Sequence, residues 1–340
     1  MKKKIALLLV LTLTVFALAA CGGGAKPPVG GEEAAVKTGL AVVTSIAKST
    51  DAGEKDGNAQ TDTTVVAVTV GEDGVITNCA IDVVETKIAF SAEGKIITPM
   101  DAVFNGKQDI GDGYGMKKAS GIGKEWYEQA NALAAYAIGK SVADLKGIAV
   151  TESGSPADAD LSSSVTIAIG GFINAIEKAV QNAEALGAHA DDSIGIGLSS
   201  SIAKSKDAGE EEGVAQAYVD IAAVTFGADG KVTSCIIDAV QADIAIKADG
   251  TIATDLATTF DSKNILGDAY GMKKASSIGK EWYEQAAGFA AYVVGKSVAE
   301  VKGIALTEEG VAADSDLASS VTVHIGPFMS NVERAAALAK

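Results

Sequence analysis

The apolar positions along this chain change their spacing, from an alternation typical of strands to a three- or four-residue spacing typical of helices. Runs rich in Val and Thr, or with apolar and polar side chains in alternation, predict β-strands. Four segments have this pattern: residues 39–46, 63–70, 75–84 and 87–97. The turn Glu72-Asp73-Gly74 predicts a hairpin, and Glu93-Gly94 would divide the last segment into a second strand pair.

Helical spacing follows these strands. Residues 123–138 are predicted to form a helix that ends at Gly139, followed by a short helix at 142–145, a strand at 147–151 and a closing helix at 172–186. The apolar face of the first helix consists of Ile122, Trp126, Ala130, Leu133 and Ala137. Strands in succession followed by helices predict an α+β fold, in which an antiparallel sheet packs against helices.

The whole pattern occurs twice, with a constant offset of 156 residues. Trp126 recurs as Trp282 and Cys79 as Cys235, and residues 112–130 differ from residues 268–286 at only two positions. The sequence therefore predicts two tandem copies of one domain. We refer to residues 38–187 as repeat 1 and to residues 193–340 as repeat 2, with a short polar joint between them.

The first residues have the features of a secretory signal. Three lysines follow Met1, and the apolar run over residues 5–20 is shorter than the roughly 20 residues that span a bilayer. The segment Leu18-Ala19-Ala20-Cys21 closely resembles a bacterial lipobox, which implies a signal peptide over residues 1–20 and a lipid such as palmitate on Cys21. An ordinary cleaved signal or an uncleaved anchor is the alternative.

The lipid would hold the protein on the extracytoplasmic face of the cell membrane. Residues 21–37, rich in Gly and Pro, predict a tether between the lipid and the folded part. The formal net charge of −16 becomes −19 once the three lysines of residues 1–20 are removed. This excess of negative charge argues against a nucleic-acid partner, which requires basic patches.

Several common chemistries are excluded by the residues that the two repeats share. His189 and His324 are the only histidines and occupy non-equivalent positions, so the repeats share no histidine triad or histidine zinc site. Residues 51–54 do not have the spacing of a calcium loop, and residues 121–124 lack the Ser or Thr of a Walker phosphate loop. Each repeat has one cysteine on the apolar face of a predicted strand, which predicts a small buried side chain.

The first shared candidate segment precedes the predicted Trp126 helix. It begins Tyr114-Gly115-Met116-Lys117-Lys118 and recurs in repeat 2 with Tyr270 and Lys273. Two lysines and backbone N–H groups at a helix start would suit an anion such as phosphate. A glycine-permitted turn with solvated lysines is the alternative. Trp126 is predicted to lie in the core, which leaves Tyr114 free to face a ligand.

The second candidate segment lies before the closing helix and is rich in Ser and Thr. A helix N-terminus of this composition needs no function. The segment nevertheless resembles the Asp-x-x-Ser-Gly-Ala-Thr motif of the FMN-binding domain family, found in flavin subunits of ion-pumping oxidoreductases and in lipoproteins of extracellular electron transfer. Ser164 and Val165 stand where the motif has Gly and Ala. The matched positions are Asp160, Ser163 and Thr166 in repeat 1, and Asp316, Ser319 and Thr322 in repeat 2.

This resemblance implies one FMN in each repeat. In the family, a separate flavin transferase links the Thr of the motif to FMN through a phosphoester, which makes Thr166 and Thr322 the implied attachment sites. The implied function is electron transport by a flavoprotein that acts as a carrier more than as an enzyme, with a membrane quinone oxidoreductase as its electron donor. The alternative is a non-redox surface lipoprotein that serves as a ligand-binding or adhesin-like module.

Overall fold

The computed structural model describes residues 35–340, which belong to one compact unit, Glu33–Lys340. The predicted signal peptide, Cys21 and most of the predicted tether lie outside the described residues. In the described part of the chain, no helix combines the length and the apolar character needed to cross a membrane.

Repeat 1 forms a three-stranded antiparallel sheet in the order β1 (Lys37–Ser45), β2 (Gly57–Val70) and β3 (Ile76–Phe90). The hairpin predicted at Glu72-Asp73-Gly74 joins β2 and β3. The second predicted strand pair is wrong in part, because β3 continues to Phe90 and only an isolated Phe90–Ile96 bridge follows it.

Repeat 2 forms the second sheet from β5 (Ser193–Ser201), β6 (Gly213–Phe226) and β7 (Val232–Ile246). Its edge strand, β4 (Val103–Asn105), comes from repeat 1 and pairs with β5. Repeat 2 makes the equivalent contact with the sheet of repeat 1, where Thr259 forms an isolated antiparallel bridge with Ser45 of β1. Each repeat thus adds a short segment to the sheet of the other.

The helices follow the same order in both repeats. Repeat 1 contains α1 (Lys107–Ile110), η1 (Gly111–Tyr114), η2 (Met116–Lys118), α2 (Trp126–Ala137), α3 (Val142–Lys146), α4 (Ala159–Ser162) and α5 (Gly170–Gln181). Repeat 2 contains α6 (Lys263–Leu266), η3 (Gly267–Tyr270), α7 (Trp282–Val293), α8 (Val298–Lys302), α9 (Ser315–Ala318) and α10 (Gly326–Leu338).

Several elements after the sheet differ from the sequence-based prediction. Helix α2 begins at Trp126, because Glu125 and Glu128 form a capping box there. The strand predicted at residues 147–151 is wrong, since Val150 takes part only in an isolated bridge to Pro156. The closing helix α5 ends at Gln181, five residues before the predicted end, and the chain then leaves the helix.

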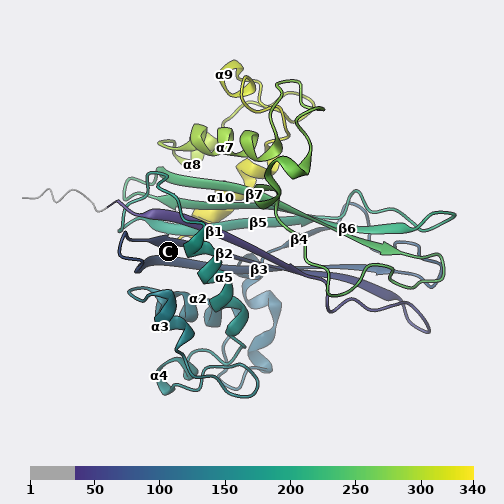
Figure 1. The fold of residues 1–340 in the computed structure, drawn as a ribbon, viewed down its shortest axis with the longest axis horizontal. Helices are drawn as coiled ribbons and strands as arrows, with labels where there is room; N and C mark the ends of the chain where they lie inside the picture. The colour runs from purple at the N-terminus through teal and green to yellow at the C-terminus, as the bar shows by residue number, and fades with distance from the viewer. Residues whose placement is uncertain (1–34) are drawn as a thin grey trace, which may run out of the picture. The chain divides into compact units, whose positions relative to one another are not determined.

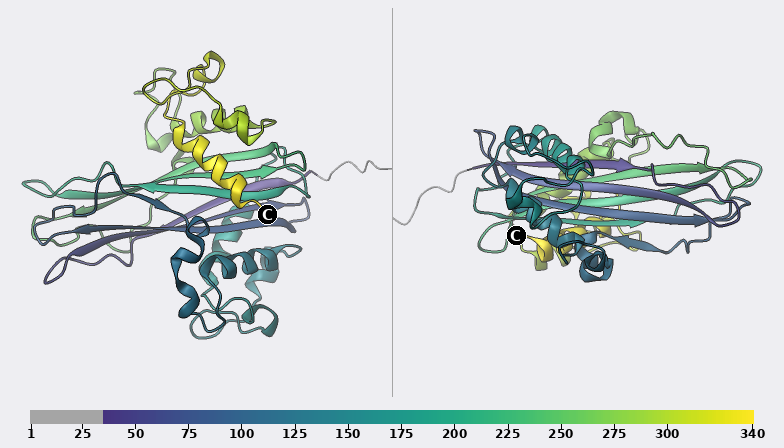
Figure 2. Two further views of the ribbon diagram at one scale, coloured as in Figure 1. Left: turned by 180° about the vertical axis from the view of Figure 1, so that it is seen from behind. Right: turned by 90° about the horizontal axis from the view of Figure 1, so that it is seen from below.

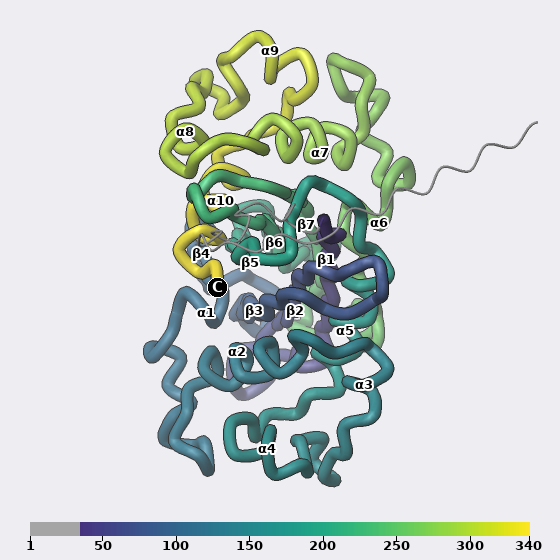
Figure 3. The backbone as a smooth tube through the Cα atoms, turned by 90° about the vertical axis from the view of Figure 1, so that its left-hand side faces the viewer, coloured from purple at the N-terminus to yellow at the C-terminus, as the bar shows by residue number. Residues whose placement is uncertain are grey.

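The two sheets lie face to face, and helices cover the outer face of each (Figures 1 and 2). Helices α2 and α5 pack on the repeat 1 sheet, and α7 and α10 pack on the repeat 2 sheet. Figure 3 shows β5 and β6 beside β2 and β3, between these helical layers. The inner faces share an apolar core to which both repeats contribute: Leu40, Val65 and Val84 with Ile196, Val219 and Val240. The fold is therefore α+β, as predicted, and the repeats form one folded unit.

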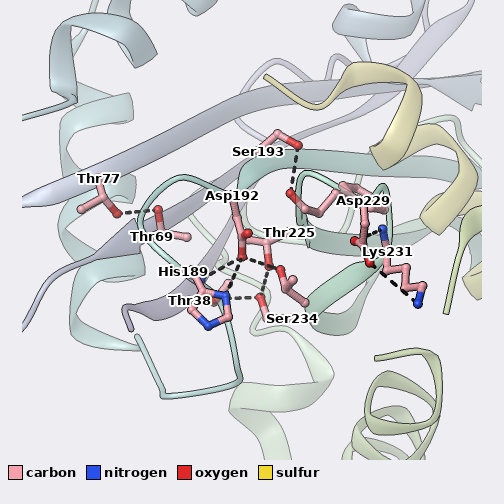
Figure 4. A network of polar contacts seen from close by, with 12 residues as sticks. Thr38, Thr69, Thr77, His189, Asp192, Ser193, Thr225, Asp229, Lys231 and Ser234 are labelled. Atoms are coloured by element: carbon pink, nitrogen blue, oxygen red, sulfur yellow. Dashed lines mark hydrogen bonds and ion pairs between the residues drawn. The ribbon is translucent and has the colours of Figure 1, made fainter. Parts of the chain in front are cut away.

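Polar contacts also join the repeats (Figure 4). The buried Thr38 and Ser234 hydroxyls lie 2.7 Å apart across the interface, and Ser234 also contacts Thr225 at 2.7 Å. Asp192, at the end of the predicted joint, accepts hydrogen bonds from the Thr233 hydroxyl at 2.6 Å and from the His189 backbone at 2.8 Å. The segment between the repeats is thus fixed to repeat 2.

The cysteines of the two repeats are free, and both are buried, as predicted. Cys79 and Cys235 are 6% and 5% exposed and belong to the cores beneath the helices. Burial raises the pKa of each thiol to about 12, so each behaves as a small apolar side chain.

Candidate functional site

The two candidate segments meet at the first turn of α2, where they are joined by the side chain of Gln129. This side chain is fully buried. Its amide nitrogen donates to the Ser120 hydroxyl at 3.1 Å and to the Lys124 carbonyl at 3.3 Å. Its amide oxygen accepts from the backbone N–H of Thr166 at 2.8 Å and from the Thr166 hydroxyl at 3.1 Å. One buried amide therefore fixes the end of the lysine turn (residues 114–120) and the threonine loop (residues 160–166).

Repeat 2 has the same arrangement around Gln285. Its nitrogen donates to Ser276 at 3.1 Å and to the Lys280 carbonyl at 3.3 Å. Its oxygen accepts from the Thr322 backbone at 2.7 Å and from the Thr322 hydroxyl at 3.1 Å. Neither glutamine was predicted from the sequence, although a polar residue on the apolar face of a helix was a visible signal.

Two backbone N–H groups of the lysine turn are already bonded within the protein and are not available to an external anion, contrary to the prediction. The N–H groups of Met116 and Lys117 donate to the carboxylate of Glu125 at 2.8 and 2.9 Å, and Glu125 is 2% exposed. Glu281 accepts the equivalent bonds in repeat 2. The protein's own carboxylate therefore occupies the anion position. The exposed ammonium groups of the turn, among them Lys117 and Lys273, remain to attract a phosphate.

The remaining motif residues shape the threonine loops. Asp160 and Ser163 are exposed, and the Ser163 hydroxyl donates to the Asp160 carbonyl at 3.3 Å. In repeat 2, Ser319 donates to the Asp316 carbonyl at 2.7 Å. These hydroxyls satisfy carbonyls at the end of a one-turn helix, which is a local structural role.

The Val that replaces Ala in the motif points away from the loop surface. Val165 and Val321 are fully buried and belong to the cores under α2 and α7. Thr166, the next residue, is exposed, and Thr322 is half-buried. The larger side chain of Val therefore adds to the core and leaves the outer face of the threonine unobstructed.

Tyr114 lies in a different environment from the threonine loop, next to a buried lysine. Lys107 is 7% exposed, and its ammonium contacts Glu85 at 2.7 Å and lies 4.4 Å from the centre of the Tyr114 ring. The Tyr114 hydroxyl donates to the same carboxylate at 3.1 Å. Burial opposes ionisation of Glu85, but hydrogen bonds and charge attraction from Lys107 and Lys87 outweigh it and lower the Glu85 pKa to about 2.

The equivalent lysine of repeat 2, Lys263, has no such ion pair, because Gln241 replaces Glu85. Its ammonium donates to the Tyr218 hydroxyl at 2.6 Å. It also lies 4.4, 4.3 and 4.9 Å from the ring centres of Tyr218, Tyr270 and Trp282. Burial lowers the pKa of Lys263 to about 8. Aromatic rings therefore surround a buried lysine in both repeats, but a carboxylate forms an ion pair with it only in repeat 1.

Comparison of the chain with protein-family models, with curated proteins and with solved structures gave no match to any of them. Function is therefore inferred from the residues themselves. Within residues 35–340, no group of three or more His, Cys, Asp or Glu side chains is placed to hold a metal ion.

The threonine loops can hold a ligand through an oxygen atom in a fixed position. A hydroxyl has one donor and two acceptor positions, and the Thr166 hydroxyl uses its proton on Gln129. Its lone pairs remain free to accept a further hydrogen bond. An ester at this oxygen would replace the O–H bond, so the modified threonine would no longer donate to Gln129. The lysine turn bonds to the other end of the same Gln129 amide, through Ser120. Its exposed lysines place positive charge near the threonine loop.

Proposed function

We propose that each repeat carries one FMN at its threonine loop, and that the protein is an extracytoplasmic electron carrier held on the membrane through Cys21. The observation that carries this proposal is the repeated geometry. In both repeats a buried glutamine holds a threonine hydroxyl at the surface, next to a turn that bears exposed lysines.

The residues fit a phosphoester at this position. Thr166 and Thr322 would provide the ester oxygen, and Lys117 and Lys273 would provide charge for the phosphate. The buried side chains of Val165 and Val321 do not narrow the outer face of the loop. When bound, FMN would supply the electron chemistry.

The protein residues would orient the attachment point. Before attachment, Gln129 accepts from both the backbone N–H and the hydroxyl of Thr166, which fixes the backbone and the side-chain rotamer together. After attachment the hydroxyl proton is gone, and the backbone N–H bond to Gln129 would still hold the loop. Because Gln129 is itself held by Ser120 and by the Lys124 carbonyl, the loop keeps its position relative to the lysine turn. A membrane quinone oxidoreductase is the class of partner that would supply electrons to such a carrier.

Intact-mass spectrometry of protein made in cells that contain a flavin transferase tests this proposal. The wild-type chain should carry two FMN increments, and Thr166→Val or Thr322→Val should each remove one. Thr151→Val is the matched control, because Thr151 is an exposed threonine of repeat 1 outside the loop. A wild-type chain without any flavin increment would contradict covalent flavin carriage.

A further inference from the structure

A cavity of about 180 Å³ lies between the repeats. No residue of the threonine loops lines it. Strand β3 and helices α1 and α2 of repeat 1 form one side, and β5 with the end of α10 forms the other. Apolar side chains make up most of its wall, including Ile81 and Ile138 from repeat 1 and Ile196 and Leu338 from repeat 2.

A buried carboxylate, Asp82, lines this apolar cavity. Asp82 is 1% exposed, and its Oδ1 atom accepts from the backbone N–H groups of Val83 at 2.7 Å and Gln108 at 3.0 Å. Its Oδ2 atom has no hydrogen-bond donor within residues 35–340. Burial raises the pKa of Asp82 to about 7. A buried carboxylate oxygen without a donor is costly and therefore unusual in a folded protein.

Two neighbouring side-chain amides add further unused groups. The Gln108 amide nitrogen donates to the Ile81 carbonyl at 2.9 Å and to the Asn131 side-chain oxygen at 3.0 Å. The oxygen of Gln108 and the amide nitrogen of Asn131 have no partner in the described part of the chain. These side chains offer the cavity two acceptors, on Asp82 and Gln108, and one donor, on Asn131. Lys340 also lines the cavity, and burial lowers the pKa of its ammonium group.

Repeat 2 lacks this combination at the equivalent place. Asp238 corresponds to Asp82 and accepts the same two backbone bonds, but the neighbouring Ser262 side chain also favours its charged form, which opposes the rise in pKa that burial causes. Gly106 replaces that serine in repeat 1, and a Cβ atom there would collide with Oδ2 of Asp82. Ala287 stands where repeat 1 has Asn131. The polar groups without partners are therefore a feature of repeat 1 and not of the shared fold.

We propose that this cavity binds a small primary amine as its ammonium ion, with the organic group of the ligand between the apolar walls. An ammonium supplies the N–H donors that Asp82 and Gln108 lack, and its charge pairs with the carboxylate. A cavity of about 150 Å³ holds benzene, so this one admits a ligand of about the size of benzylamine. The negative net charge of the protein also favours a cation.

Calorimetric titration of the full-length protein at pH 8 with benzylamine, and with benzyl alcohol as the neutral analogue, tests the proposal. Benzylamine should bind saturably and at least about tenfold more tightly than benzyl alcohol. The ammonium of benzylamine makes a charge-assisted hydrogen bond to Asp82, whereas the hydroxyl of benzyl alcohol carries no charge. Asp82→Asn should weaken benzylamine binding by about tenfold or more. The matched control, Asp238→Asn, should leave it within about twofold of wild type.

A second pair of variants keeps the test independent of the buried carboxylate. Ile138 lines the cavity but is 44% exposed, and its equivalent in repeat 2, Val294, is 41% exposed. Ile138→Trp should obstruct the cavity and weaken binding, whereas Val294→Trp should not. The proposal would be overturned if benzylamine did not bind, or if benzyl alcohol bound equally well. It would also be overturned if Asp82→Asn and Asp238→Asn had equal effects, or if Ile138→Trp and Val294→Trp had equal effects.

Discussion

The buried ion pair between Glu85 and Lys107 gives a quantitative prediction. Their side chains are 15% and 9% exposed, and the charged atoms lie 2.7 Å apart. Glu85→Gln removes the negative charge with almost no change in volume. It also recreates the residue that repeat 2 has at this position, Gln241, but without the Tyr218 that contacts the lysine there. Lys107 would then be a buried cation without a carboxylate partner.

The size of the effect follows from the pKa of Glu85. This pKa falls from its ordinary value of 4.5 to about 2 in the folded protein. At about 1.4 kcal/mol per pKa unit the shift corresponds to about 3 kcal/mol, which we reduce to about 2 kcal/mol because the carboxylate remains in contact with solvent. We therefore expect Glu85→Gln to lower the free energy of unfolding by about 2 kcal/mol at pH 7.

The pKa of Glu85 also determines how the stability difference between wild type and Glu85→Gln depends on pH. A carboxyl group whose pKa is lowered by folding stabilises the native state above its unfolded pKa, and this stabilisation is lost as the pH falls through the folded value. The difference between wild type and Glu85→Gln should therefore be constant above about pH 5 and should shrink between about pH 4.5 and pH 2.

Urea unfolding followed by circular dichroism at pH 7, 5 and 3 measures this difference directly. Glu93→Gln serves as the control, because Glu93 lies on an exposed turn and its loss should change stability by less than about 0.5 kcal/mol. Equal stability of Glu85→Gln and wild type at pH 7 would refute the reasoning. A difference that stays the same at pH 3 would refute it as well.

The remaining predictions concern the lysine of repeat 2, a half-buried aspartate and the glutamine of the site. Lys107→Met should destabilise the protein at pH 7, because it removes the ion pair with Glu85. Lys263→Met should be neutral or stabilising, because burial lowers the pKa of Lys263 to about 8 and outweighs the attraction from Asp220 and Asp238, neither of which forms an ion pair with it within residues 35–340. Urea unfolding compares the two variants. Burial raises the pKa of Asp220 to about 7, so the stability that its protonated form provides should be lost as the pH rises from 4 to 8, by at most about 4 kcal/mol. Asp220→Asn should remove this part of the pH dependence, and an unchanged pH profile would contradict the assignment. Gln129→Leu should cost about 2–4 kcal/mol because it leaves backbone N–H groups of the threonine loop without an acceptor. Hydrogen-exchange mass spectrometry should then show faster exchange at Thr166, and unchanged exchange there would contradict the role of Gln129.

The local features of the fold follow well from the sequence. Trp126 and Cys79 were predicted to be buried from their positions on apolar faces, and they are 4% and 6% exposed. The α+β class and the hairpin between β2 and β3 also follow from short-range patterns. These features depend on residues close together in the chain, where the alternation of side chains and the turn residues carry the information.

Features that depend on distant partners did not follow from the sequence. Strand β4, only three residues long, has no pattern of its own and exists because β5 of the other repeat pairs with it. The segment after α3 has the composition of a strand, but Val150 meets only Pro156 and finds no neighbouring strand to extend the pairing.

At the candidate site, the sequence pointed to the two segments but not to the residues that join them. Glu125 and Gln129 lie in the shared segment before and within α2, and their roles depend on backbone groups up to 38 residues away. Lys107 reads as an ordinary surface lysine, since its partner Glu85 and the Trp126 ring belong to other elements. Burial of charged side chains is decided by packing, which local patterns do not report.

The most direct test of flavin carriage is the intact mass of the wild-type protein, isolated from cells that contain a flavin transferase and denatured before measurement. The predicted result is a mass increase of two FMN increments that survives denaturation. Thr166→Val should remove one increment, and Thr322→Val should remove the other. A mass equal to that of the unmodified polypeptide, apart from any lipid on Cys21, would contradict covalent attachment at both repeats.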